Sequence, residues 1–429
     1  MLIYNKISKE KVLIVGVELI DDPIDIDSSM EELSELVKAA YGEVVAQIVQ
    51  KRATIDSAFF IGKGKVEEIS SYCNKLDIDT VVFNDELSGA QLRNLEDIIN
   101  RKIVDRTNLI LDIFANRATT KEGKLQVKLA QLNYRLPRLV GFRDYLSREG
   151  GGIGTRGPGE QKLETDRRHI LREINNIEKE LKSIEKRREV TRKRRLNSKL
   201  PMVALVGYTN AGKSTLLNKI IEKNEDYDVK KRVFVYDMLF ATLDTAFRRG
   251  TLPNGQDFLI TDTVGFVSKL PTNLIEAFKG TLEEVQYADV ILHVVDASNK
   301  DLDIQLKTTY NILKELEVLN KPIITVFNKI DKVNIDGIFY ENNYIDNKVF
   351  ISATKNKNLE ELLEMIEKLL PQKFTEVTLQ IPYDKQDILA YICDNYDVEK
   401  LEYLEYGSLI KVSLNQIDYE RYKAFEKIR

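Results

Sequence analysis

The sequence has few of the residues that build disulfide frameworks, zinc sites or membrane spans. Its 429 residues include only two cysteines, Cys73 and Cys393, which lie far apart and form no CxxC pair. This excludes a disulfide framework and a structural zinc site, and it fits a reducing compartment inside the cell. No run of about 18 apolar residues occurs, and the N-terminus lacks a secretory pattern. We therefore expect a cytoplasmic protein without a transmembrane segment, and a peripheral membrane contact stays open.

Charge and histidine also give little indication of a partner. The formal net charge is only -4, so a nucleic-acid surface would have to come from local clustering of basic residues. The two histidines, His169 and His293, have no constellation of partner residues around them, and we interpret both as structural. The length suggests two to four domains, and we expect a monomer.

Residues 1–118 alternate between strand-like and helix-like segments. Buried strands are predicted at 11–19 and 80–87, and helices at 28–42 and 65–76, with Ser28 as the N-cap of the first. This alternation predicts a small α/β domain with a mainly parallel sheet.

Residues 119–199 have a different pattern, in which leucines recur at helical spacing until Pro137 ends the helix. A glycine-dense segment follows at 149–160, and a long polar helix is predicted from Leu163 onward. The apolar positions of that helix have the a/d spacing of a coiled coil, so it needs a partner. We predict an antiparallel helical hairpin with the glycine-rich segment at its tip. The two stripes consist of Leu125, Leu129, Leu132 and Leu136, and of Leu163, Ile170, Ile174, Ile177, Leu181 and Ile184.

The end of the long helix is strongly basic, because residues 186–199 contain one acid, Glu189. A solvated linker is one interpretation, since charge runs are usually solvated. Contact with RNA phosphates is the other, because each neutralised phosphate releases counterions.

The segment Met202–Thr215 carries the most specific motif of the chain. A buried strand leads into GYTNAGKS, which matches GxxxxGK[ST] and is followed by a helix. The glycines allow backbone N–H groups to face phosphates, and the helix N-terminus adds positive potential. Lys213 is expected to reach the β- and γ-phosphates, and Ser214 to bind Mg²⁺.

Two later motifs complete a phosphate and magnesium site. The buried strand 258–262 ends in DTVG, which places Asp262 to hold Mg²⁺ and the Gly265 N–H to sense the γ-phosphate. Between the motifs, Thr242 and Thr245 are candidates for a second Mg²⁺-binding hydroxyl on a mobile switch loop.

The motif Asn328–Asp331 (NKID) indicates guanine. A carboxylate at Asp331 accepts the N1–H and N2–H₂ donors of guanine, which adenine lacks. Asn328 is expected at the O6/N7 edge and the Lys329 stem on the base plane, with a backbone N–H of Ser352–Ala353 meeting O6. Four motifs in this order, each at the end of a strand, predict a GTPase rather than an ATPase.

Phe266 follows Gly265, where Ras-type enzymes have the glutamine that orients the attacking water. Phenylalanine has no donor or acceptor for this role. Either another residue of the chain supplies the function, or intrinsic hydrolysis is slow until a partner accelerates it, and we favour the second.

These segments together resemble the HflX family of ribosome-associated GTPases. The resemblance rests on the stretches 61–69, 105–118, 129–139 and 151–168, on the P-loop, and on LFATLD, DTVGF and NKID. It implies an α/β fold in four parts. These are an N-terminal α/β domain (1–118), a helical coiled-coil hairpin (119–199), a P-loop G domain (200–372) and a small C-terminal α+β domain (373–429).

The resemblance also implies binding to the ribosome, mainly the large subunit, splitting or rescue of stalled ribosomes, and GTP hydrolysis that releases the factor. It places the second magnesium ligand at Thr242 and the catalytic roles at Lys213, Thr242 and Gly265, with Mg²⁺ held by Ser214, Thr242 and Asp262. The predicted nucleotide-binding residues are Gly207, Tyr208, Thr209, Asn210, Ala211, Gly212, Lys213, Ser214, Thr215, Phe240, Ala241, Thr242, Leu243, Asp244, Asp262, Thr263, Val264, Gly265, Asn328, Lys329, Ile330, Asp331, Ser352, Ala353 and Thr354.

With the family included, the glycine-rich tip is expected to contact ribosomal RNA, since glycines permit close backbone approach. The chain has Gln161 and Lys162 where the family usually has a Thr-Gln pair, so this contact can differ here. The segment 61–65 (IGKGK) lacks P-loop spacing and is interpreted as a turn or a basic contact. The predicted RNA-binding residues are Arg143, Arg148, Arg156, Lys162, Arg167, Arg168, Arg187, Arg188, Arg192, Lys193, Arg194 and Arg195.

Two other classes of function stay open. The first is an RNA-binding module or assembly factor that nucleotide merely stabilises, without ribosome-stimulated turnover. The second is a signalling GTPase with a protein partner, which the basic hairpin argues against.

Overall fold

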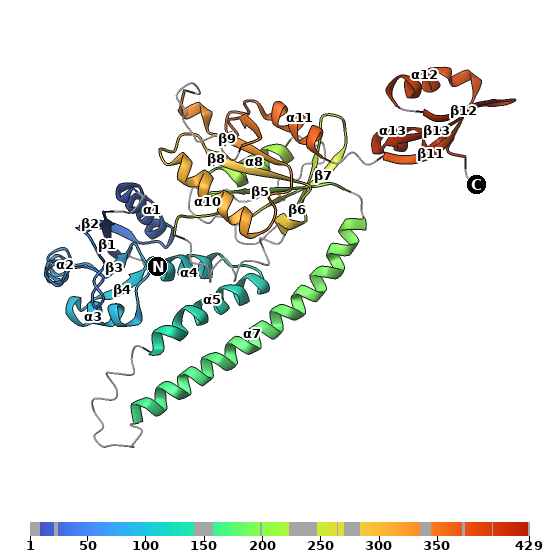
Figure 1. Cartoon of the computed structure of the whole chain (residues 1–429). Coiled ribbons are helices and arrows are strands. Elements are labelled where there is room, and N and C mark those ends of the chain that lie inside the picture. Colours follow the sequence, from blue (N-terminus) through green and yellow to red (C-terminus); the bar gives the residue numbers. More distant parts are fainter. Residues whose placement is uncertain are drawn as a thin grey trace, which may run out of the picture.

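The computed structural model describes residues 9–20, 25–140, 158–197, 200–222, 247–263, 265–269, 284–334, 345–370, 374–396 and 398–427. Three separate sheets organise these residues, and a pair of long helices lies beside the first two (Figure 1). No helix among the described residues is long and apolar enough to cross a membrane.

The N-terminal sheet is parallel and has the strand order β2-β1-β3-β4. Helices α1 and α4 pack on one face around Ile14 and Leu33, and α2 and α3 pack on the other face around Leu13 and Ile69. The elements are β1 (Lys11–Leu19), α1 (Ile26–Ala39), β2 (Glu43–Arg52), α2 (Lys63–Leu76), β3 (Thr80–Phe83), α3 (Gly89–Ile99), β4 (Lys102–Asp105) and α4 (Arg106–Arg117).

Two local predictions in this region were wrong. Helix α1 begins at Ile26, because Asp25 is the N-cap and its carboxylate accepts the Ser28 N–H at 3.1 Å. The predicted strand 80–87 ends at Phe83. Beyond it the Leu87 N–H donates to the buried Asp105 carboxylate at 3.0 Å instead of to a neighbouring strand.

Helices α5 (Lys121–Val140) and α7 (Pro158–Asn197) run antiparallel, with Lys121 paired to Glu180 and Lys128 to Glu173. Leu132, Ile170, Ile174 and Ile177 form the buried seam between them. Helix α5 also buries Val127, Ala130 and Tyr134 in the core of the N-terminal sheet, so it belongs to two cores.

Helix α5 continues through Pro137, which was predicted to end it. The proline lies in the last turn, where few intrahelical bonds remain to be lost. Nearby, the Arg138 guanidinium donates to the Tyr134 carbonyl at 2.8 Å. The long helix starts at Pro158, earlier than the predicted Leu163, because proline is favoured in the first turn of a helix.

The second sheet has the order β10-β9-β8-β5-β7-β6, parallel except for the antiparallel edge strand β6. Its carboxyl ends carry the loops of the phosphate and base motifs, where ligands of such sheets bind. The elements are β5 (Met202–Gly207), α8 (Lys213–Ile221), β6 (Phe247–Thr251), β7 (Asp257–Asp262), β8 (Val290–Asp296), α10 (Leu302–Glu315), β9 (Ile323–Asn328), β10 (Asn347–Phe350) and α11 (Leu359–Leu369).

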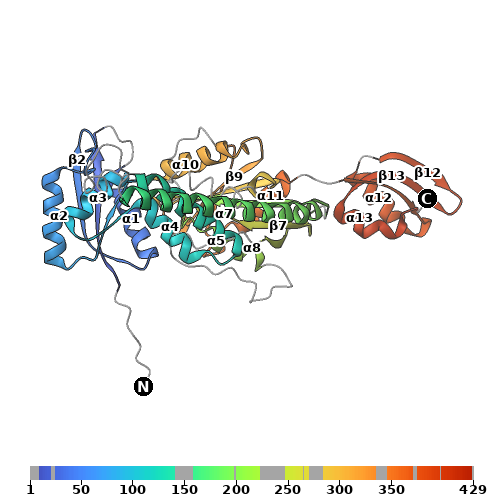
Figure 2. The same ribbon diagram turned by 90° about the horizontal axis from the view of Figure 1, so that it is seen from below.

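The C-terminal sheet is antiparallel with the order β11-β13-β12, and two helices cover one face around Leu379, Ile392 and Ile410. It lies at the end of the molecule farthest from the N-terminal sheet (Figure 2). The elements are β11 (Phe374–Ile381), α12 (Gln386–Asn395), β12 (Val398–Leu404), β13 (Gly407–Asn415) and α13 (Gln416–Tyr422).

Candidate nucleotide-binding site

The loop between β5 and α8 is shaped by two glycines with positive φ. Gly207 has a φ of 144°, and a Cβ there would lie 2.1 Å from the Val294 carbonyl oxygen. Gly212 has a φ of 93°, and a Cβ there would lie 2.3 Å from the Asn328 side-chain nitrogen. A side chain at either position would clash, so the loop requires glycine at both ends.

Lys213, the first residue of α8, is buried and turns back over the loop. Its Nζ donates to the carbonyls of Gly207 at 2.9 Å and Tyr208 at 2.8 Å. Burial lowers the pKa of Lys213 to about 8, and the nearby Asp262 carboxylate partly opposes that shift. The ammonium group therefore lies where phosphate oxygens would approach the loop.

Ser214 and Asp262 meet at the carboxyl ends of β5 and β7. The Ser214 hydroxyl donates to Asp262 Oδ2 at 2.6 Å. Asp262 is 1% exposed, so the pair is held inside the protein at the edge of the sheet. A hydroxyl and a carboxylate are hard oxygen ligands, which fits Mg²⁺.

The backbone after Gly265 is joined directly to the phosphate loop. The Thr209 N–H donates to the Phe266 carbonyl at 2.7 Å, and the Phe266 N–H donates to the Gly207 carbonyl at 3.1 Å. The Phe266 ring is 2% exposed and packs with Tyr208 in the apolar layer under α10. Its side chain therefore serves the core, which agrees with the prediction that it does not orient water.

The base motif occupies the ends of β9 and β10. Asp331 accepts a hydrogen bond from the Ser352 hydroxyl at 2.5 Å, and this bond holds the pKa of the Asp331 carboxyl below its ordinary value. The ionised carboxylate is the form that accepts the two guanine donors. Asp331 is exposed to solvent, so its carboxylate is accessible to a ligand.

Both ends of the Asn328 amide already have protein partners. Its nitrogen donates to the Ala211 carbonyl at 2.9 Å, and its oxygen accepts the Ala353 N–H at 3.0 Å. Asn328 thus joins the phosphate loop to the loop after β10. We expect it to shape the base pocket, and the second N–H of its amide is left for the O6/N7 edge that the sequence predicted.

Lys329 has a left-handed backbone, with a φ of 67°. Its Nζ donates to the Asn210 carbonyl and to the Asp296 carboxylate, both at 2.7 Å. These bonds extend the lysine stem along the loop, in position to flank a base plane.

The remaining predicted site residues have various positions. The Thr263 hydroxyl donates to the Leu205 carbonyl at 2.7 Å, inside the sheet. Ile330 and Ser352 are buried. Thr215 lies in α8, and Thr354 lies in the loop after β10. Phe240, Ala241, Thr242, Leu243, Asp244 and Val264 lie outside the described residues.

Of the predicted RNA-binding residues, Arg167, Arg168 and Arg187 are exposed on α7. Arg168 pairs with Glu164 at 2.9 Å, and Arg188 pairs with Glu122 of α5 at 2.9 Å. Lys162, Arg192, Lys193, Arg194 and Arg195 belong to the described backbone of α7 but not to its described side chains, and Arg143, Arg148 and Arg156 lie outside the described residues.

The N-terminal domain contacts the phosphate loop and the segment after Gly265, which sequence reasoning did not anticipate. Glu32 of α1 accepts the Tyr208 hydroxyl at 2.9 Å and the Ser268 N–H at 3.2 Å. Arg106, 1% exposed, pairs with Glu32 at 2.9 Å and donates to the Ser268 hydroxyl at 2.9 Å. Arg106 lies in one of the family-like stretches, and that was its sole signal in the sequence.

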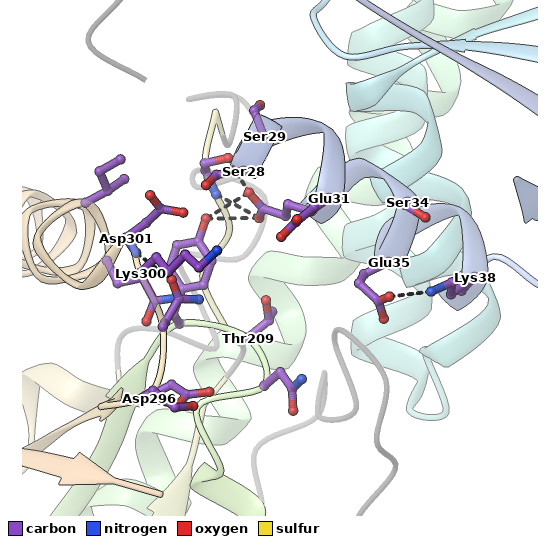
Figure 3. Close-up of a pocket in the computed structure, with 18 residues that line it drawn as sticks. Ser28, Ser29, Glu31, Ser34, Glu35, Lys38, Thr209, Asp296, Lys300 and Asp301 are labelled. Atoms are coloured by element: carbon purple, nitrogen blue, oxygen red, sulfur yellow. Dashed lines mark hydrogen bonds and ion pairs between the residues drawn. The ribbon is translucent and has the colours of Figure 1, made fainter. Parts of the chain in front are cut away.

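A groove of about 540 Å³ lies beside this contact, between α1 and the phosphate loop (Figure 3). Its lining includes Thr209 of the phosphate loop, Asp296 and Lys300 on the G-domain side, and Glu31 and Glu35 on α1. The phosphate loop therefore faces the N-terminal domain across a polar groove.

The two histidines have different surroundings. His293 is buried in β8, where burial and the charge of Lys213 lower its pKa to about 3, so it is neutral. His169 is exposed on α7. Among the described residues neither takes part in the site, in agreement with a structural interpretation.

The site combines a phosphate loop, a serine–aspartate pair that fits Mg²⁺, and a carboxylate suited to guanine, all at the carboxyl ends of the strands of one sheet. This combination defines a P-loop GTPase. Family models match three segments, described as "GTP-binding GTPase N-terminal" (27–115), "GTP-binding GTPase Middle Region" (117–195) and "50S ribosome-binding GTPase" (202–329).

Curated relatives cover nearly the whole chain. The GTPase HflX of Caldanaerobacter subterraneus is 46% identical over 98% of this chain and 95% of its own length. The GTPase HflX of Escherichia coli is 38% identical over 92% of each chain. A solved GTP-binding protein from Sulfolobus solfataricus in complex with GDP has a TM-score of 0.43 at 26% identity, covering 84% of this chain and 98% of its own. The chain belongs to the HflX family of GTPases, and it is a GTP-hydrolysing enzyme.

Proposed function

We propose that the protein binds the large ribosomal subunit in its GTP state, splits or rescues stalled ribosomes, and leaves when GTP is hydrolysed. The matched family description, "50S ribosome-binding GTPase", supports the partner. The proposal treats the protein as a cytoplasmic monomer whose four parts act together.

The observation that carries this proposal is the contact of Glu32 and Arg106 with Tyr208 and Ser268. Tyr208 belongs to the phosphate loop and Ser268 follows the γ-phosphate-sensing Gly265. A change of Gly265 on hydrolysis therefore reaches α1 and α4 through buried, charge-assisted bonds. Helix α5 shares the core of α4, so the same change reaches the hairpin.

At the site, Lys213 neutralises charge on the β- and γ-phosphates. Ser214, Asp262 and Thr242 would hold Mg²⁺, which would supply positive charge for the phosphates when bound. Phe266 cannot position water, so intrinsic hydrolysis is slow and the ribosome accelerates it by ordering the switch segments.

The hairpin supplies the contact with ribosomal RNA. Arg167, Arg168 and Arg187 are exposed on α7, and the basic residues that follow toward its end extend this charge. Basic side chains on a protruding helix bind phosphate by counterion release, with strong dependence on salt.

The test is GTP turnover by the purified protein with and without purified large ribosomal subunits, at low and at moderate salt. Strong stimulation that weakens with added salt supports the proposal. Ribosome binding without stimulation favours a nucleotide-stabilised RNA-binding module or an assembly factor. Fast turnover by the isolated protein, unchanged by subunits, contradicts the role given to Phe266.

A further inference from the structure

The C-terminal domain exposes an unusual number of large apolar side chains at one place. Tyr403 is 68% exposed and Tyr406 is 76% exposed, while Leu401 and Leu404 are 36% and 38% exposed. Tyr383 is 50% exposed and donates its hydroxyl to the Leu404 carbonyl at 2.8 Å. These five residues lie at or beside the β12–β13 turn and are called the hairpin patch, with Leu404 on the face of the strand opposite Leu401 and Tyr403. Exposed apolar side chains gathered at one place mark interaction sites.

The patch is an extension of the domain core past its covering helices. In the antiparallel register Leu401 lies opposite Ile410 and Tyr403 opposite Ser408, both of which are buried. Leu401 and Tyr403 therefore point to the core face of the sheet, but on the edge strand they stay exposed. Burying them requires a partner, because the described helices of this domain leave them open.

Strand β12 also has an open edge. It is the last strand in the order β11-β13-β12, and it lies on the side of the domain away from the G domain in both views (Figures 1 and 2). Edge strands accept an extended segment through their unpaired backbone groups. The patch side chains and the edge are thus accessible to the same partner.

Acidic residues alternate with the patch residues along the chain. Glu399 and Glu402 lie in β12 and Glu405 lies in the turn that follows, and Lys400 is bound to Glu402 at 2.7 Å. Lys411 of β13 is bound to Glu399 at 2.8 Å and also pairs with Glu376. Over residues 374–427 there are eleven Asp and Glu against six Lys and Arg. The negative potential opposes phosphate and favours a cationic partner.

We propose that the hairpin patch binds an arginine- and lysine-rich protein segment of the large ribosomal subunit, laid along the β12 edge. The tyrosine rings receive the cationic side chains, and the glutamates pair with them. The inference rests on the proposed function. In it, the helical hairpin of α5 and α7 contacts ribosomal RNA, and the C-terminal domain contacts a ribosomal protein.

The first experiment places a photo-crosslinking amino acid at Tyr406 of the full chain. The matched control carries it at Ser413, which is exposed on the opposite face of the same sheet. After irradiation with purified large subunits, a product at position 406 that resists nuclease and is lost to protease supports the inference. A nuclease-sensitive product, or no product in a chain that still sediments with subunits, overturns it. Failure to sediment at all counts against the proposed function itself.

The second experiment reverses one charge with Glu405→Lys. A basic protein partner predicts that affinity for large subunits falls by about threefold to tenfold, because an attractive charge becomes repulsive. An RNA partner predicts the opposite sign, since the added lysine would bind phosphate. The control is Asp394→Lys, the same change at an exposed site on α12. An increase, or equal effects of the two variants, overturns the inference.

Discussion

Single residues decide the choice of base in this site. The Ser352 hydroxyl keeps the pKa of Asp331 below its ordinary value, and the exposed carboxylate is the group expected to accept the guanine donors. The neighbouring Asn328 is bound to Ala211 and Ala353, which positions its amide beside Asp331 and leaves one N–H for the O6/N7 edge.

We expect Asp331→Asn to raise the Kd for a fluorescent GDP analogue by about 100-fold, because two hydrogen bonds to a charged acceptor are lost or replaced by a repulsive amide donor. The measurement is a fluorescence titration, repeated with the xanthine analogue, which the asparagine variant should prefer. Asp346→Asn, at an exposed position of the same domain, serves as the control and should leave both affinities unchanged.

Lys213 gives the site a dependence on pH. Burial lowers the pKa of Lys213 to about 8 in the free protein, so the ammonium group loses its proton above that pH. Bound phosphates raise the pKa again, and binding therefore takes up a proton above pH 8. Affinity for GDP should be nearly flat below about pH 7, fall by about twofold between pH 7 and 8, and fall about fivefold between pH 8 and 9.

The Lys213→Arg variant tests whether Lys213 causes the pH dependence, because a guanidinium keeps its charge between pH 8 and 9 while other groups still titrate. The variant's affinity is expected to stay level between pH 8 and 9, whatever its absolute value. An equal decline in the arginine variant would assign the pH dependence to another group.

At the scale of elements, the contact of α1 and α4 with the G domain depends on one carboxylate. Glu32 is the counter-ion of the buried Arg106 and accepts bonds from Tyr208 and Ser268. Glu32→Gln leaves the arginine charge buried without its partner, which costs about 3 kcal/mol.

We expect Glu32→Gln to lower the thermal unfolding midpoint clearly, as measured by calorimetry. Glu31→Gln changes the adjacent exposed residue of α1 and should have almost no effect. Equal midpoints for the two variants would show that the contact contributes nothing to the folded protein.

The seam between α5 and α7 is held by a few buried aliphatic residues. Ile174 is 7% exposed and packs with Leu132 and Ile177. Ile174→Ala removes buried methyl groups and leaves a cavity, at a cost of about 2–4 kcal/mol. Amide hydrogen exchange along α7 should speed up in this variant, whereas Glu173→Ala, on a partly exposed neighbour, should change it little. Unchanged protection would mean that α7 is stable without its seam.

At the scale of the whole molecule, charge is divided between the parts although the net charge is only -4. The end of α7 is basic and the C-terminal domain is acidic. Replacing Arg192, Lys193, Arg194 and Arg195 with glutamine should weaken binding to large subunits and reduce the slope of log affinity against log salt by up to about 3. Sedimentation with subunits at four salt concentrations measures this slope, and a slope equal to that of the parent would exclude phosphate contact by these residues.

The control replaces four lysines of the G domain with glutamine, which removes the same amount of charge and should leave the slope unaltered. These lysines are Lys348, Lys355, Lys357 and Lys368.

The motifs specified much of the fold and site because their function depends on local backbone geometry. Gly207 and Gly212 need positive φ, and Lys213 starts the helix that follows. The loop can therefore be predicted from the spacing of these residues alone. Element ends were less predictable. Asp25 rather than Ser28 caps α1, and Pro137 is tolerated in a last turn, because both outcomes depend on which backbone groups lack partners in the folded chain.

The sequence by itself determined the nucleotide class, the alternation of strands and helices, and the need of the long α7 for a partner, since each depends on neighbouring residues or on a short period. Only the tertiary structure decided that Glu32 and Arg106 meet Tyr208 and Ser268, that both ends of Asn328 are occupied, and that α5 belongs to two cores. These contacts join residues as far as 236 positions apart. No local pattern encodes such a pairing, because it forms only where two different sheets bury their charged groups against each other.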